Sequence, residues 1–196
     1  MRRRLLLAAA ALPACSLLPE RPYIETLRFP LTADRPPPAA ASRGRRVLLV
    51  RLLRAAPGLE QRGLRSIRPD GTEAVEAYAE WVAPPAEAAE EALRRWLAAS
   101  GRFAAVVAPG TRARVDLVLE SELIALIADR RRSEARAGIA LVLLREGPLA
   151  AEMLLQRTIL AHAPLAGETP AEMAAAMRAA LAAALAEVEA ALAPYA

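Results

Sequence analysis

The only cysteine in this sequence, Cys15, is the residue whose chemistry its surroundings define best. It follows a short cationic head of three arginines at residues 2–4 and an apolar run over residues 5–12. A basic head, an apolar run and a small-residue cleavage site are together typical of a secretory signal. The run is too short to cross a bilayer as a helix, which takes roughly 20 apolar residues. We therefore predict a signal peptide over residues 1–14.

The residues before Cys15 indicate that its thiol carries a lipid. Leu12, Ala14 and Cys15 resemble a bacterial lipobox, in which the cysteine becomes the new N-terminus and is acylated. The alternative is a small buried side chain, because free cysteine is among the most buried residue types. An unpaired cysteine in an exported chain needs a use, however. Each buried acyl CH₂ contributes about 0.8 kcal/mol, so several chains would hold the protein on a membrane.

The net charge of +4 at pH 7 does not indicate a nucleic-acid partner. All basic residues are arginines, concentrated in the first third of the chain, and the remainder is acidic. Loss of the signal peptide removes three of them and leaves a nearly neutral protein. Such a protein lacks the basic footprint that duplex binding requires.

The sequence offers little for catalysis. His162 is the only histidine, so a nucleophile–histidine–acid triad would depend on it, and no serine lies in a Gly-x-Ser-x-Gly motif. One histidine and a committed cysteine do not make a metal site, and no phosphate-binding loop is present. Glu120 and Glu122 are close in sequence but fall on an expected solvated face. We predict a protein that is not an enzyme and uses no cofactor or metal.

Strand patterns occupy much of the chain between residues 23 and 161. Residues 15–46 are expected to be the lipidated N-terminus and a proline-rich tether with solvated arginines, and they include an extended segment at 23–31. The expected strands lie at 47–53 (apolar, covered on both faces), 63–68 and 72–79 (a hairpin around Asp70-Gly71), 103–107, 115–127 (leucines alternating with acids), 135–145 and 149–161. Helix formers at residues 150–156 leave the last arm open.

Two helices are expected, over residues 85–100 and 169–193. Pro85 suits the first position of the first helix. Thr169 and Glu172 form a capping box for the second helix. An apolar stripe follows at helical spacing, consisting of Met173, Met177, Leu181, Leu185, Val188 and Leu192. The order of elements predicts a single α+β domain at 47–196, with two main helices on a mainly antiparallel or mixed sheet.

The corner before the first helix contains Trp81, Pro84 and Pro85. We favour a core tryptophan here, because the following helix needs a fixed direction and aromatic residues are scarce. The alternative is an exposed aromatic anchor for a partner, since tryptophan is enriched at interface hot spots.

These motifs, in order, resemble those of the ABC-type transport auxiliary lipoproteins, the PqiC-like companions of MCE-domain lipid transport systems. The matching residues are Cys15, Tyr23, Leu27, Trp81, Pro84, Pro85, Leu97, Gly101 and Phe103, followed by the acidic alternating strand and the long last helix. The resemblance implies a lipoprotein that faces the periplasm, usually on the outer membrane, with which Ser16 after the cysteine is consistent. Its partners would be an MCE-domain protein and the ABC permease and ATPase subunits that move lipids between membranes. Contact of the domain itself with phospholipid stays open.

Three alternatives remain. The first is another scaffold lipoprotein, such as an envelope-assembly or secretion accessory factor. The second is a lipid-binding carrier with an apolar cavity between helix and sheet. The third is an envelope hydrolase, which would need His162 buried beside a nucleophile.

Overall fold

The structure is a computed structural model that describes residues 22–36, 44–147 and 150–196. The predicted signal peptide, the predicted lipid attachment site Cys15 and two of the three consecutive prolines, Pro37 and Pro38, lie outside the described residues.

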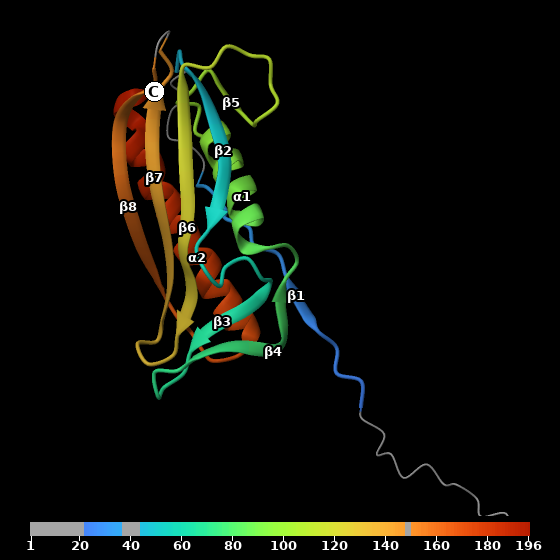
Figure 1. The fold of residues 1–196 in the computed structure, drawn as a ribbon. Coiled ribbons are helices and arrows are strands. Elements are labelled where there is room, and N and C mark those ends of the chain that lie inside the picture. Colours follow the sequence, from blue (N-terminus) through green and yellow to red (C-terminus); the bar gives the residue numbers. More distant parts are fainter. Residues whose placement is uncertain (1–21, 37–43, 148–149) are drawn as a thin grey trace, which may run out of the picture.

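The described residues form one sheet of eight strands, two α-helices and a final 3₁₀ turn (Figure 1). In chain order the elements are β1 (Leu27–Phe29), β2 (Val47–Ala55), β3 (Gly63–Ile67), β4 (Glu73–Trp81), α1 (Pro85–Ala99), β5 (Ala105–Val107), β6 (Leu117–Asp129), β7 (Glu134–Arg145), β8 (Glu152–Pro164), α2 (Pro170–Leu192) and η1 (Ala193–Tyr195).

The long strand β6 organises the sheet. On one side it pairs antiparallel with β7, which pairs in turn with β8. On its other side it pairs parallel with two strands at different points along its length. Leu48 of β2 is opposite Leu117 near the start of β6, and Ser66 of β3 is opposite Ala128 near its end. The antiparallel partner of β3 is β4, while β1 and β5 are short parallel strands at the outside. The sheet is therefore mixed.

Both helices pack on the same face of the sheet (Figure 1). Helix α2 lies against β8, β7 and β6, and α1 lies against β2 and β5. Leu117, Leu119 and Leu123 of β6 are fully buried on this side, and Glu120 and Glu122 alternate with them. This arrangement confirms the predicted single α+β domain and the half-solvated strand.

One prediction about β2 is wrong. The apolar run was expected to be covered on both faces, but only one face is, because the two helices share a side of the sheet. Leu48, Val50 and Leu53 are buried, whereas Arg51 and Arg54 are exposed on the other face. A register shift between Val50 and Leu53 also leaves Leu52 66% exposed.

The turn and helix-end signals have the predicted structures. The hairpin of β3 and β4 turns through Asp70 and Gly71, which has a φ of +90°. Helix α1 begins at Pro85 and is followed by Gly101, with a φ of +68°. Both arms of the last hairpin are strands, so the helix formers at residues 150–156 do not prevail over pairing with β7.

The folded unit reaches further toward the N-terminus than the boundary predicted at residue 47. Strand β1 pairs with β4, and Leu31 is buried in the core. Arg35 is mostly buried and forms an ion pair with Glu189, in contrast to the solvated arginines expected in this segment. Backbone pairing and an ion pair therefore hold the segment before β2 on the domain.

Helix α2 begins with the predicted capping box. The Thr169 hydroxyl accepts a hydrogen bond from the Glu172 backbone N–H at 3.3 Å, and the Glu172 carboxylate accepts one from the Thr169 backbone N–H at 3.0 Å. The apolar stripe that follows is completely buried. The cap fixes where the helix starts, and the stripe fixes which side faces the sheet.

Replacement of the cap is expected to weaken the fold measurably. We predict that Thr169→Ala lowers the free energy of unfolding by about 1 kcal/mol, because the backbone N–H of Glu172 loses its acceptor. Thr169→Ser keeps the hydroxyl and should remain close to the parent. Urea denaturation followed by circular dichroism measures both, and equal losses in the two variants would contradict the cap as the cause.

Candidate docking surface

The predicted partner-contact corner is mostly internal. Trp81 is 1% exposed and Pro85 is buried, so both belong to the core. The Trp81 backbone N–H donates to the carbonyl of Arg62 at 2.7 Å, and Trp81 pairs in register with Phe29 of β1. Pro84 is half-buried, and the exposed apolar residue at this corner is Val82. A partner that meets this corner as it stands would touch Val82 and Pro84 and not the indole.

His162 has the surroundings of a surface residue. It lies on β8, its side chain is 43% exposed, and its Nδ1 is 3.3 Å from Glu134 Oε2. Within the described part of the chain, no hydrogen bond joins it to a serine hydroxyl, and no cluster of three or more metal-ligating side chains is found.

A buried carboxylate, Asp129, stabilises the turn between β6 and β7. Its side chain is fully buried and accepts hydrogen bonds from the Arg131 side chain at 3.2 and 3.3 Å. The Nη2 atom of Arg136 lies 3.6 Å from Asp129 Oδ2. The hydrogen bonds from Arg131 hold the pKa of Asp129 below its usual value, against the opposing effect of burial. An acid ionised so firmly suits a structural role, because a general acid or base needs a pKa near the working pH.

A second buried carboxylate, Glu189, joins segments that are far apart in sequence. Its Oε1 accepts from Arg35 Nη2 and Arg102 Nε, both at 3.0 Å. Its Oε2 accepts from Arg35 Nε at 2.9 Å and from the indole N–H of Trp96 at 2.8 Å. The hydrogen bond from Arg35 is the largest cause of a pKa lowered to about 2, again against desolvation. This cluster was not predicted from the sequence.

The side of the sheet opposite the helices is bare, and we call it the open face: the outward residues of β2, β6, β7 and β8. Two ion pairs cross it, Arg51 to Glu120 at 2.5 Å and Arg54 to Glu122 at 3.5 Å. A shallow hollow of about 220 Å³ lies between β6, β7 and β8. Most of the hollow's lining is polar or small, and it includes Thr158. The open face is thus a broad surface of mixed polarity, carried on strands of 12 and 13 residues.

The open face ends at a free strand edge. Among the described residues, β8 pairs with no strand other than β7, so one side of its 13 residues has no strand partner. The Tyr195 hydroxyl donates to the Leu154 carbonyl of this strand at 3.1 Å. Met153 and Leu160 on this strand are exposed. An unpaired strand edge is a template for another chain.

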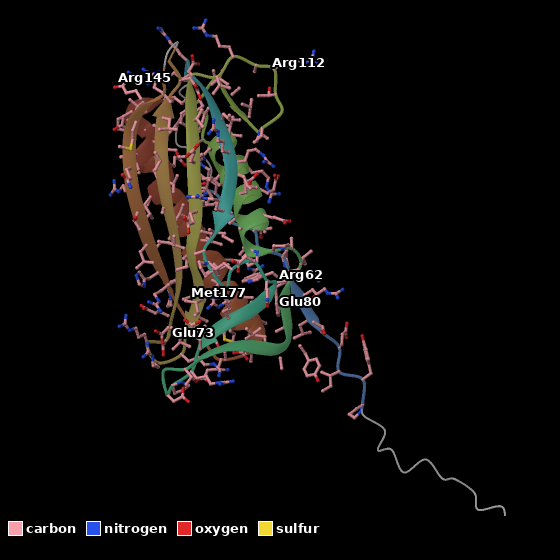
Figure 2. All side chains as sticks on the ribbon, in the orientation of Figure 1. Arg62, Glu73, Glu80, Arg112, Arg145 and Met177 are labelled. Carbon is pink, nitrogen blue, oxygen red and sulfur yellow. The ribbon has the colours of Figure 1, made fainter. Side chains whose placement is uncertain are left out.

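A basic hollow lies at the end of the sheet where β7 stops. It has a volume of about 500 Å³ and is lined in part by Arg46, Arg114 and Arg145, with Asp116 and Glu146 as counter-charges. Figure 2 shows Arg145 and Arg112 at this end, and Arg62 and Glu80 beside the N-terminal segment, away from this hollow.

The fold is similar to those of solved α+β proteins of low sequence identity. A protein from Xanthomonas campestris assigned to the DUF330 family has a TM-score of 0.70 and 23% identity, over 82% of this chain and 91% of its own. An uncharacterised protein has a TM-score of 0.68 and 12% identity, over 86% and 99%. A hypothetical protein from Chlamydia trachomatis has a TM-score of 0.52 and 10% identity, over 74% and 96%. These likenesses establish the fold.

The family follows from the sequence itself. Residues 29–189 match the model of the ABC-type transport auxiliary lipoprotein component. The chain belongs to this family, as the order of its motifs predicted. No curated protein matches the chain. In the part that the structure describes, neither helix has both the length and the apolar composition that crossing a membrane requires.

The Glu189 cluster makes stability depend on pH. The pKa of Glu189 falls from 4.5 to about 2 on folding, so its contribution is complete above pH 4.5 and is lost as the pH drops toward 2. We predict that Glu189→Gln lowers the free energy of unfolding at pH 7 by on the order of 3 kcal/mol. The difference in the free energy of unfolding between variant and parent should become progressively smaller below pH 4.5.

Urea denaturation at pH 7 and at pH 3 tests this prediction. Glu187→Gln is the matched control, because Glu187 lies on the same helix but is exposed. A gap that stays constant between the two pH values would contradict the role of the ionised carboxylate.

Proposed function

We propose that this protein is a membrane-anchored periplasmic auxiliary lipoprotein of an MCE-type ABC transport system. It assists the movement of lipids between membranes by docking to transporter subunits. The observation that carries this proposal is the family match over residues 29–189. The family match covers the auxiliary lipoprotein role, and we propose the MCE partnership and the lipid cargo in addition.

In this proposal the protein acts by binding its partners and not by catalysing a reaction. Two buried carboxylates are held ionised by arginines, and His162 is a surface residue. The helix–sheet interface is filled with fully buried leucine and methionine side chains, among them Leu185 and Met177. This packing does not favour a carrier that holds lipid between helix and sheet.

The proposed anchor is the acylated Cys15, exposed after removal of residues 1–14. The lipobox resemblance supports it, and membership in a lipoprotein family is consistent with it. Ser16 after the cysteine supports the outer membrane as the location. The proline-rich segment before residue 47 contributes to a tether, although Arg35 fixes part of it to the domain.

We propose the open face and the free edge of β8 as the docking surface for a transporter subunit. A face with two ion pairs and scattered apolar groups resembles non-obligate interfaces, whose overall polarity matches that of ordinary surface. The free edge adds backbone donors and acceptors with which a partner strand can pair.

The anchor predicts acylation at one residue. Cells fed a palmitate analogue should label the native chain, and Cys15→Ala should abolish the label and release the protein from membranes. A native chain that stays unlabelled and soluble would overturn the lipoprotein part of the proposal.

The docking surface predicts position-dependent cross-linking in intact cells. A photoreactive amino acid at Thr158, on the open face, should cross-link to an MCE-domain or permease subunit, identified by mass spectrometry. The same group at Ala186, exposed on α2, is the control and should give little of that product. Reversal of this pattern would move the docking surface to the helical side, and recovery of neither subunit from either position would contradict the MCE partnership.

A further inference from the structure

Exposed apolar side chains gather beside β1 and β4. We define the N-terminal edge patch as Tyr23, Ile24, Leu27, Tyr78 and Val82. They are five of the nine large apolar or tyrosine side chains that are exposed among the described residues, and Tyr23 is 90% exposed. Clustering of such groups at one edge of a soluble domain marks an interaction surface.

Backbone pairing brings the two parts of the patch together. Leu27 of β1 is in register with Ala79 of β4, the residue after Tyr78. The Val82 backbone N–H donates to the carbonyl of Phe29 at 2.9 Å. The patch therefore combines the segment that leads from the N-terminus with the outer strand of the sheet.

Tyr78 has a backbone conformation that its side chain disfavours. Its φ is +56°, in the left-handed region, and it lies where β4 has extra residues relative to β3, between the pairs of Gly63 and Arg65. A positive φ is unfavourable for a bulky residue. Tyr78 is nevertheless 52% exposed, so core packing does not explain the conformation.

Two arginines border the patch. Arg28 Nε lies 2.8 Å from Glu80 Oε1, and Arg62 Nη2 lies 3.9 Å from the same oxygen. Two guanidinium groups share the Glu80 carboxylate, and the exposed Glu25 lies between Ile24 and Leu27, so the charges at this border are balanced. Figure 2 shows Arg62 and Glu80 at the end of the sheet from which the N-terminal segment departs.

This composition fits the interfacial region of a bilayer. Tyrosine places its ring among acyl chains and its hydroxyl among headgroups, and the aliphatic side chains of the patch suit the same depth. Position along the chain supports the same placement. Seven residues separate Cys15 from Tyr23, and the eight steps between the two span at most about 29 Å when extended. An anchor at Cys15 would keep the patch within that distance of the membrane.

We propose that the N-terminal edge patch lies in the headgroup region of the bilayer that holds the lipid anchor. It rests the domain on that membrane in a fixed orientation. The proposal depends on the anchored lipoprotein of the proposed function and adds to it which surface faces the lipid. The open face and the edge of β8, at the opposite side of the sheet from β1, then stand clear of the membrane for a partner.

The single cysteine of the chain allows a direct test. In the acylated protein the Cys15 thiol is blocked, so a new cysteine takes a fluorescent probe alone. Two variants place it in the patch, Tyr78→Cys and Val82→Cys, at positions 52% and 53% exposed. Two controls place it elsewhere, Leu160→Cys and Leu52→Cys, at positions 49% and 66% exposed. The full-length lipoproteins are reconstituted into vesicles of phosphatidylethanolamine and phosphatidylglycerol that contain headgroup-region spin-labelled lipid.

Probes in the patch should be quenched at least about twofold more strongly than both controls, because insertion brings them to the depth of the spin label. Equal quenching at all four positions, or stronger quenching of the controls, overturns the proposal and leaves the patch to a protein partner. A chain that does not float with the vesicles contradicts the anchor and this proposal together. A chain that floats with equal quenching contradicts this proposal alone.

Discussion

One carboxylate joins segments of this molecule that are far apart in sequence. Glu189 of α2 binds Arg35 from the segment after β1, Trp96 from α1 and Arg102 from the loop that follows α1. Each of its oxygens accepts two hydrogen bonds, so the desolvated charge is completely compensated. Without this contact the two helices would share only apolar packing, and the N-terminal segment would be held mainly by β1 and the buried Leu31.

Local signals predicted most elements of the fold. The capping box at Thr169, the turn at Asp70 and Gly71, and the prolines before α1 each act over a few residues, so sequence reveals them. Long-range facts were missed. Nothing in the run at residues 47–53 tells that both helices cover the same face. One signal in the sequence does indicate Glu189. It lies four residues after Leu185, so an acid interrupts the buried apolar stripe of the helix. Its partners come from elements too distant to identify by spacing.

The candidate surfaces divide the molecule by chemistry. The helical side is closed and apolar, the open face is polar with ion pairs, and the edge beside β1 exposes tyrosines and arginines. Sequence indicated the acids of β6 and the arrangement around Trp81, but exposure decides which of these residues a partner can touch. Trp81 lies inside, while Tyr78, three residues earlier, lies outside, as alternation along a strand requires for residues three apart.

The parallel pairing of β2 with β6 bears on when this chain can fold. The Val47 N–H donates to the carboxylate of Asp116 across 69 residues, and α2, the last long element, supplies much of the core. Contacts of such high order slow folding, and here the hydrophobic centre stays incomplete until the C-terminal helix is made. A growing chain therefore remains unfolded for most of its synthesis. That delay suits a polypeptide that is exported before it folds, in keeping with the signal peptide that we predict over residues 1–14.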